Sequence, residues 1–428
     1  MISLVMFAAL SGLLVIGVPI GFAIVLATLT ATHAGDLTAI IVAQKMIAGL
    51  DSFPLMAIPF FLLAAELMSS GSLAEVLLRF ASLFVGHKRG GLGYTNVLTI
   101  TFFSGISGSA VADAAGPGAL LIRMMGRSGY PLPYAAALTA SASLVGPIIP
   151  PSIIMILYAL QDDAVSVPRL FVAGVLPGLL ISGALLGYNG YVSRRRNFRD
   201  DGVPPTWRQG LAASWRAIPA LMLPLLIVVG VHSGAFTPTE ASVIAVFYAL
   251  LCGMFIYRTL TWSMIPDILA RSAFMTAAVL LIISASMAFA WLLTYAQVPQ
   301  MMTEWIGSLG LSKLAFLLAV NVFLLIFGIF IEPLPGVLVL APILAPMAAT
   351  LGIDPTHFAI VVIINLNLGM ITPPVGSLLA VTGMVAKVRM SELNREIYPI
   401  LALQLVVLGL ITLIPALTLA LPDFLGAR

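Results

Sequence analysis

The chain has 428 residues, of which 61% are hydrophobic and only 9% charged, and its mean hydropathy is +1.11. Ordinary soluble domains carry roughly 25% charged residues, so this composition excludes a soluble protein and indicates a chain embedded in lipid. The net charge of +3 arises from short basic clusters between apolar runs, which is typical of membrane topology and not of nucleic-acid binding. We expect the one cysteine, Cys252, to pack as a small hydrophobic residue.

Nine apolar stretches are close to or above the length of about 20 residues that a membrane-spanning helix needs. The first has no basic leader and is too long for a signal peptide, so we expect a retained helix that crosses the membrane once. In chain order the nine predicted spans are Ile2–Thr32, Pro54–Phe80, Leu132–Leu160, Arg169–Tyr191, Ala217–His232, Pro238–Tyr257, Ala273–Ala296, His357–Val385 and Ile397–Leu421.

Two further apolar regions, about 93–125 and 311–349, carry Gly- and Pro-rich breaks and are predicted to be re-entrant hairpins. With these hairpins and a cytoplasmic N-terminus, 16 of the 20 basic residues fall on the inner side, as the positive-inside rule requires. A full span in place of either hairpin would destroy this asymmetry. The inner residues are Arg79, Lys88, Arg89, Arg123, Arg127, Arg194, Arg195, Arg196, Arg199, Arg208, Arg216, Arg258, Arg271, Lys387, Arg389 and Arg395, and the outer ones are Lys45, Arg169, Lys313 and Arg428.

The two halves of the chain share their Gly and Pro positions when one is shifted by 223 residues. Gly105 then coincides with Gly328, Gly146 with Gly369, and one Pro-Pro pair with the other. One unpaired span lies between the halves, so the second is predicted to be inverted. The expected division is a first repeat at 1–192, a basic loop and connecting span at 193–233, and a second repeat at 234–428. Inverted repeats with broken helices are typical of secondary transporters with a site near the midplane of the bilayer.

The predicted first hairpin and the third span carry one polar constellation. Ser104 and Ser107 lie at the hairpin tip, and Pro147, Pro150 and Pro151 interrupt the span at about 132–160. Proline removes amide donors, so carbonyl oxygens lose their helical partners. Unpaired carbonyls in hydrocarbon are costly, and an oxygen cage of this kind suits a hard cation. A plain proline kink is the alternative.

The second hairpin and the eighth span carry the inverted copy of this constellation. Pro373 and Pro374 break the span at about 357–385, and Thr372 supplies a hydroxyl group. Two acids in apolar surroundings, Asp113 and Glu332, fit either a cation or proton site or the cap of a helix.

The breaks also predict exposed helix N-termini, whose positive dipole ends favour an anionic group such as a carboxylate. We expect helices to begin at Pro151, Pro374, Gly116 and Gly336. The residues assigned to substrate binding are Ser109, Asp113, Asn365, Asn367, Pro150 and Pro374.

Four blocks in order resemble one known family, the large membrane subunit of the tripartite ATP-independent periplasmic (TRAP) transporters. The blocks are Phe103–Asp113, Gly146–Ser152, the run Leu340–Pro346 followed by Gly352–Phe358, and Asn365–Gly376. The resemblance covers essentially the whole chain. It implies an all-α integral membrane protein with the elevator fold of the ion-transporter superfamily, which combines inverted repeats, two re-entrant hairpins and two broken helices.

The same resemblance implies sodium coupling and two sodium sites. By resemblance, the first maps onto Ser104, Ser107, Gly146, Ile149 and Pro151, and the second onto Gly328, Gly369, Thr372 and Val375. It also implies two partners, a small four-helix membrane subunit and a soluble periplasmic substrate-binding protein, and a bacterial or archaeal cytoplasmic (inner) membrane.

The sequence therefore predicts sodium-driven uptake of an organic acid that a periplasmic protein delivers. The first alternative is a self-sufficient sodium/dicarboxylate carrier of the same superfamily, and the second is a channel or a purely structural membrane subunit. The sequence has no phosphate-binding loop, no redox-metal cluster and no nucleophile–base pair, so we expect neither an enzyme nor any cofactor beyond the coupling sodium ions.

Overall fold

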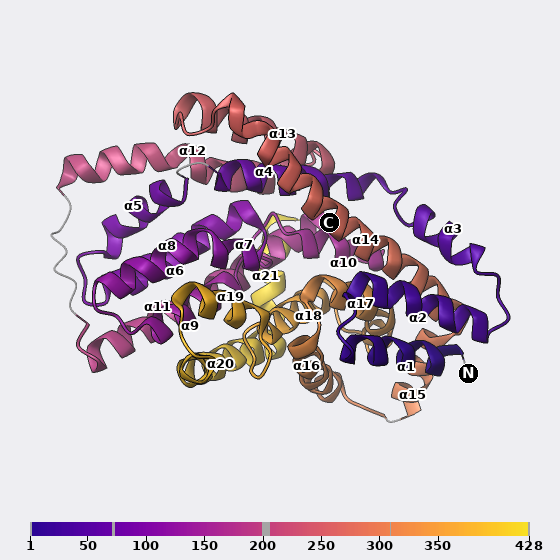
Figure 1. Cartoon of the computed structure of the whole chain (residues 1–428). Coiled ribbons are helices and arrows are strands. Elements are labelled where there is room, and N and C mark those ends of the chain that lie inside the picture. The colour runs from indigo at the N-terminus through magenta and orange to yellow at the C-terminus, as the bar shows by residue number, and fades with distance from the viewer. Residues whose placement is uncertain (1, 71–72, 199–205, 309, 427–428) are drawn as a thin grey trace.

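The computed structural model describes residues 2–70, 73–198, 206–308 and 310–426, and these residues form helices and no strand (Figure 1). Arg199 and Arg428 of the predicted charge pattern lie outside the described residues. Within the described ranges, seven helices are long and apolar enough to cross a membrane, or eight if one bent pair counts as a single span. The expected all-α membrane fold is confirmed.

The N-terminal apolar run is a hairpin of two short helices, α1 (Ile2–Val15) and α2 (Ile20–Ala34). The prediction of one spanning helix over Ile2–Thr32 is therefore wrong. Gly17 adopts a φ of +84° and Pro19 lacks an amide, so the chain reverses between them. A Cβ at Gly35 would lie 2.6 Å from Cδ1 of Ile2, which shows that α1 and α2 are antiparallel.

The predicted span Pro54–Phe80 is also wrong, because two helices divide it. A helix α3 (Ile40–Ala48) bends by 69° into the pair η1 (Phe53–Met56) and α4 (Ala57–Ser69). The sequence Ser-Ser-Gly-Ser at 69–72 interrupts the apolar run, and α5 (Leu73–Val85) follows it. This α5 packs against both α6 (Gly91–Ser107) and α12 (Trp207–His232).

The first hairpin and the first broken helix have the predicted form. The hairpin consists of α6 (Gly91–Ser107), α7 (Ala110–Ala115) and α8 (Pro117–Arg127). The broken helix consists of α9 (Leu132–Ser143) and α10 (Ile153–Gln161), separated by the proline-containing segment 144–152. The long helix α11 (Val167–Arg195) follows.

The middle of the chain carries the connecting span and the start of the second half. Its helices are α12 (Trp207–His232), α13 (Pro238–Leu251), which continues as a π-helical turn η2 (Cys252–Ile256), η3 (Trp262–Met264), α14 (Ile265–Tyr295) and α15 (Val298–Ser308). Cys252 is buried, as a packed hydrophobic residue would be.

The second hairpin consists of α16 (Lys313–Phe330) and α17 (Pro333–Thr350), and the second broken helix of α18 (Pro355–Gly369) and α19 (Ser377–Ala386). The last helices are α20 (Met390–Leu413) and α21 (Ala416–Leu425). The predicted span Ile397–Leu421 is wrong at its end, because Pro415 separates these two helices. From α6 onward, helix bounds in the two halves follow the same spacing of 223 residues, to within a few positions.

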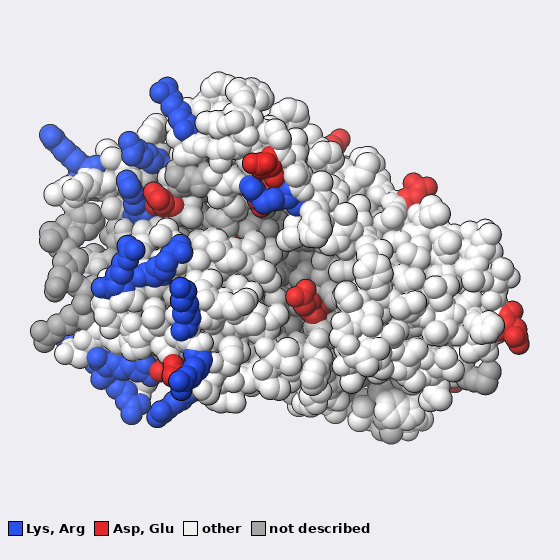
Figure 2. Space-filling model, viewed as in Figure 1, with Lys and Arg blue, Asp and Glu red and all other residues white. Residues whose placement is uncertain are grey.

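Lys and Arg side chains gather at one end of the molecule, where α5, the end of α11 and the start of α12 lie (Figure 2). The opposite end of the face shown carries acidic side chains only. We call the first of these the basic end. At this end Arg196 forms two hydrogen bonds of 2.9 Å with the carboxylate of Glu396, which ties α11 to α20.

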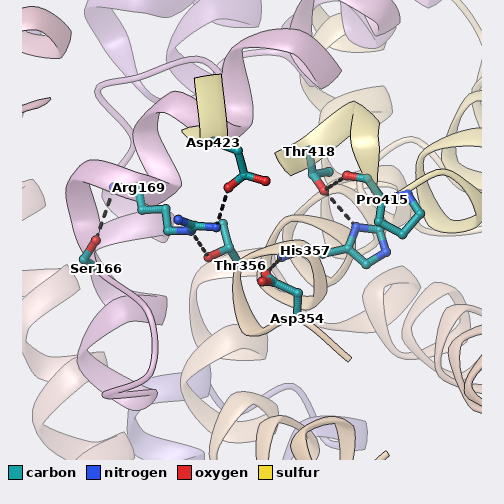
Figure 3. Close-up of polar contacts among 8 residues, drawn as sticks. All are labelled: Ser166, Arg169, Asp354, Thr356, His357, Pro415, Thr418 and Asp423. Carbon is teal, nitrogen blue, oxygen red and sulfur yellow. Dashed lines mark hydrogen bonds and ion pairs between the residues drawn. The ribbon is translucent and has the colours of Figure 1, made fainter. Parts of the chain in front are cut away.

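The two hairpins open at opposite ends of α11. Near its C-terminus, Asn189 donates to the carbonyl of Gly90, at the base of the first hairpin, over 3.1 Å. Near its N-terminus, Arg169 donates to Thr356, beside the base of the second hairpin, and forms an ion pair of 2.9 Å with Asp423 (Figure 3). With 29 residues, α11 is about 43 Å long, the thickness of a bilayer with its headgroups.

Candidate functional site

The tip of the first hairpin packs directly against the first broken helix. Gly108 ends α6 with a φ of +61°, and a Cβ there would lie 2.5 Å from the carbonyl oxygen of Pro151. Ser109 then caps α7, because its Oγ accepts a hydrogen bond of 3.4 Å from the amide of Ala112. Only glycine fits both the backbone conformation and the close approach at position 108.

Asp113 lies at the centre of this contact and is fully buried. Its carboxylate accepts a hydrogen bond of 2.6 Å from Ser104 Oγ and another from Ser107 Oγ. None of the ion pairs among the described residues includes Asp113. The capping alternative for Asp113 is not what the structure shows, since Ser109 caps the helix and Asp113 groups with the two serines.

The break in the first broken helix supplies the opposite wall. A Cβ at Gly146 would lie 2.8 Å from Asp113 Oδ2, so the backbone of the break touches the carboxylate. No backbone amide in the described chain donates to the carbonyls of Gly146, Ile149 or Pro151. The side chain of Ile149 lies between Gly105 of α6 and Gly178 of α11, so this residue also borders the hairpin. The structure thus brings together all five residues of the predicted first sodium site.

The helices beyond the breaks begin slightly later than predicted. Ser152 caps α10: its Oγ accepts from Met155 N and donates to the carbonyl of Pro147 over 2.6 Å, so the helix begins at Ile153 and not at Pro151. In the second copy, Gly376 has a φ of +42° and α19 begins at Ser377, not at Pro374. The predicted start at Gly336 is wrong, because α17 already begins at Pro333, whose ring favours the first turn of a helix.

The second hairpin meets the second broken helix through two glycines. A Cβ at Gly369 would lie 2.3 Å from the carbonyl carbon of Gly328, so the two backbones are in contact. Thr372 Oγ1 donates to the carbonyl of Leu368 over 2.8 Å and keeps its lone pairs free. Val375 is 49% exposed, so this copy is more open than the first, where the break is almost completely buried.

The residues predicted to bind substrate are not all brought together. Asn365 is buried and donates to Asn321, to the carbonyl oxygen over 3.0 Å and to Oδ1 over 2.7 Å. Asn321 in turn donates to Thr412 over 2.9 Å. The amide nitrogen of Asn365 therefore forms hydrogen bonds between α18 and α16 and has no donor left for a substrate. Sequence reasoning missed Asn321 and Thr412, and the only signal was their polarity within apolar helices.

The other predicted substrate residues differ in how accessible they are. Asn367 is fully buried, and none of the described residues makes a hydrogen bond with its side-chain amide. Pro150 is buried, whereas Pro374 is exposed. Glu332 occupies the N-cap position of α17 but makes no capping hydrogen bond with its side chain.

A family model described as "Tripartite ATP-independent periplasmic transporter, DctM component" matches residues 5–417. The match includes both hairpins and both broken helices. The chain belongs to the DctM family. The family consists of membrane components of transporters, so the DctM chain is a multi-pass transport protein.

Curated relatives agree over nearly the full length of this DctM chain. It is 42% identical over 384 residues to the C4-dicarboxylate TRAP transporter large permease protein DctM of Pseudomonas aeruginosa, with 90% of each chain covered. It is 38% identical over 418 residues to the sialic acid TRAP transporter large permease protein SiaM of Vibrio cholerae, with 97% of each covered. The 2,3-diketo-L-gulonate TRAP transporter large permease protein YiaN of Escherichia coli is 37% identical over 400 residues, with 92% of this chain and 93% of the relative covered.

Solved structures with a similar fold are membrane transporters of distant sequence. The YdaH transporter of Alcanivorax borkumensis aligns with a TM-score of 0.64 at 15% identity, over 87% of this chain and 86% of the other. MtrF of Neisseria gonorrhoeae aligns with a TM-score of 0.58 at 16% identity, over 87% and 84%. At these identities the likeness shows the fold alone.

Proposed function

We propose that this DctM chain carries out sodium-coupled uptake of an organic acid. The observation that carries the proposal is the buried carboxylate of Asp113, which has two serine hydroxyls around it and, among the described residues, carbonyls free of backbone hydrogen bonds and no basic partner. A buried charge without compensation is strongly unfavourable. A sodium ion coordinated by Asp113 and these oxygens neutralises it, because hard cations prefer oxygen ligands.

The second copy supports a second sodium site, which binds the ion more weakly because it has no buried carboxylate among its described residues. Thr372 Oγ1 donates its proton to the carbonyl of Leu368, so its lone pairs remain available to a cation. The carbonyls of Thr372 and Pro373 receive no backbone hydrogen bond from the described residues. Each positive charge that enters down a potential of about 100 mV supplies about 2.3 kcal/mol, so two sodium ions with a monocarboxylate carry one net charge and concentrate the substrate about 50-fold from the electrical term alone.

An elevator motion fits the way in which the two parts of the molecule meet. A separate apolar cluster joins Ile153 and Leu157 of α10 and Leu338 of α17 to Ile58 of α4 and Ile283 of α14. Such contacts are non-directional, so one surface can slide over the other without losing hydrogen bonds of fixed geometry. In this proposal α1–α4, α13 and α14 form the static scaffold, and the hairpins, broken helices, α11 and α20 move together.

Transport of an organic acid is supported by the relatives, which are named as C4-dicarboxylate, sialic acid and 2,3-diketo-L-gulonate permeases. In the chain itself, the N-termini of α10 and α19 follow the two breaks, and their free amides favour an anion. Asn367 offers an unpaired buried amide group. A substrate carboxylate near the breaks is the arrangement that these features favour.

The family description, a tripartite periplasmic transporter, supports two partners. These are a small four-helix membrane subunit and a periplasmic protein that delivers the substrate, and the membrane is the cytoplasmic (inner) membrane. The orientation follows the positive-inside rule, with the basic end cytoplasmic.

The N-terminus requires a revised proposal. The expected cytoplasmic position assumed that residues 2–32 cross the membrane once, but α1 and α2 form an antiparallel hairpin. Ile2 therefore lies on the same side as Gly35, across the molecule from α5 and the basic end (Figure 1). We place the N-terminus on the outer side.

The test uses proteoliposomes with the full complex and a potential clamped by potassium. Uptake of a candidate acid, measured with and without sodium at the same potential, is expected to require sodium. Persistent uptake without sodium contradicts the coupling. Omission of the periplasmic protein separates the alternatives, because continued uptake then identifies a self-sufficient carrier, and ion flux far above carrier rates identifies a channel.

A further inference from the structure

A groove at the basic end lies outside the site described above. It has a volume of about 940 Å³ and lies between α5 and the first half of α12, with the end of η2 closing it. Its walls combine apolar side chains, such as Val76, Leu83 and Ile256, with two arginines, Arg79 and Arg216. This groove, which we call the α5–α12 groove, is both apolar and cationic.

The two arginines have no acidic partner among the residues that the structure describes. None of the ion pairs among the described residues includes Arg79 or Arg216, although Glu75 also lines the groove. Both guanidinium groups are exposed and able to take a bidentate anion such as a phosphate. An apolar trough beside an unpaired cationic pair matches a molecule with an anionic head and a hydrocarbon tail.

The position of the groove favours a lipid over a soluble anion. Trp215 lines it and is 74% exposed, and the exposed residues Leu211, Ile218 and Met222 continue along α12. An exposed tryptophan among exposed aliphatic residues is typical of the boundary between headgroups and hydrocarbon. The basic residues nearby are those of the side that the positive-inside rule makes cytoplasmic, where anionic lipids attract arginine.

The walls of the groove are also fixed in place. Tyr257 donates a hydrogen bond of 2.9 Å to the carbonyl of Arg216, and Tyr248 donates one of 2.7 Å to the carbonyl of Pro219. These bonds hold α12 to the end of α13 and to the turn that follows it. The α12 wall of the groove is therefore fixed to the α13 side, and α5 packs against α12 to form the other wall.

We propose that the α5–α12 groove binds one anionic phospholipid, with the phosphate between Arg79 and Arg216 and an acyl chain along the apolar wall. The α5 helix leads into the first hairpin, and α12 leads from α11 to α13. A lipid between α5 and α12 therefore contacts both helices that connect the proposed scaffold to the hairpins and α11. The binding does not depend on the proposed transport mechanism, and it rests on the proposed function only for the cytoplasmic orientation of the basic end.

Native mass spectrometry of the detergent-purified chain tests the binding with phosphatidylglycerol and phosphatidylcholine as probes. We expect one tight phosphatidylglycerol, and phosphatidylcholine to bind at least about tenfold more weakly. An arginine near a membrane surface contributes up to about fivefold to the binding of an anionic lipid. The double variant Arg79→Gln/Arg216→Gln loses both contributions, so phosphatidylglycerol binding should weaken by at least about tenfold. Glu75→Gln should tighten it, because a repulsive charge is removed.

Arg208→Gln, on the same helix but outside the groove, is the matched control and should bind like the unaltered chain. A melting curve for each variant verifies that it is folded. Equal binding of the two lipids, or undiminished phosphatidylglycerol binding in a folded double variant, overturns the proposal. Displacement of the lipid by millimolar inorganic phosphate also overturns it, because the groove then takes a soluble anion.

Discussion

The two copies of hairpin and broken helix share a backbone plan but differ in chemistry. Positions 104, 107 and 113 hold two serines and an aspartate in the first copy, and the residues 223 positions later are Phe327, Phe330 and Gly336. The first copy is held by hydrogen bonds to a buried carboxylate, and the second by the contact of Gly328 with Gly369.

This difference shows that an inverted repeat fixes where the backbone opens but not what the opening binds. Pro-Pro pairs create free carbonyls in both copies, since the loss of amide donors is a property of the main chain. Only the first copy adds a buried carboxylate at the contact, since Asp113 is fully buried and Glu332 of the second copy is exposed. We therefore expect the first copy to contribute most of the sodium affinity and the second copy to tune it.

The largest effect is expected from Asp113→Asn, which removes the charge but keeps the shape. The sodium concentration at half-maximal uptake should rise at least about 100-fold, roughly 2.8 kcal/mol. Sodium-dependent thermal stabilisation of the purified chain measures the same loss without transport. The matched control is Asp163→Asn, at an exposed position outside the site, which should behave like the unaltered protein. Unchanged sodium affinity in Asp113→Asn would contradict the claim that the first copy contributes most of the sodium affinity.

The second largest effect is expected from Gly369→Ala. The added methyl would lie 2.3 Å from the carbonyl carbon of Gly328, and a backbone atom cannot rotate away. Overpacking of this kind costs about 1–3 kcal/mol, so the melting temperature and uptake should both fall. Gly409→Ala is the control, because no atom lies within 4 Å of its added methyl. Equal melting temperatures and uptake in the two variants would show that Gly328 and Gly369 are not in close contact.

A third prediction compares one hydroxyl from each copy. Ser104→Ala removes a donor to Asp113 and a ligand oxygen, so sodium affinity should fall about tenfold. Thr372→Val removes an oxygen whose proton is bonded to its own helix, and a loss of about threefold is expected. Sodium titrations of uptake give both values. A larger loss in Thr372→Val would reverse the assigned order of the two sites.

The smallest effect is expected from Arg196→Gln at the basic end. The side chains of Arg196 and Glu396 are 39% and 16% exposed, so solvent screens their ion pair, and its loss should cost less than about 1 kcal/mol. The melting temperature should fall slightly and the difference should shrink in high salt. Arg194→Gln serves as the control, because Arg194 forms no ion pair with any of the described residues. A drop as large as that of Gly369→Ala would contradict this ranking.

The features that were predictable from the sequence are those that local chemistry dictates. Both broken helices follow from proline pairs, and both hairpins follow from glycine-rich breaks together with the charge bias. The hairpin of α1 and α2 was missed because Gly17 and Pro19 interrupt the apolar run without changing its hydropathy. A run of apolar residues reports burial in lipid, but not the direction in which the chain travels.

The site was predictable in its members but not in its pairings. Ser104, Ser107 and Gly146 were expected to converge, and they do. Asp113 was assigned to substrate, whereas the structure bonds it to both serines, because capping by Ser109 places it on the inner side of α7. The bond from Asn365 to Asn321 spans 44 residues of sequence, and only the packing of α16 on α18 reveals it.

The length of α11 has a consequence for how the protein avoids leaks. One helix is fastened near its ends to the regions at the bases of the two hairpins, through Asn189 on one side and Arg169 on the other. These two entrances are thereby kept at a constant separation. In the proposed elevator motion, any shift that uncovers one entrance therefore carries the other by an equal amount in the same direction, and the proposal predicts no pathway that is open to both compartments at once.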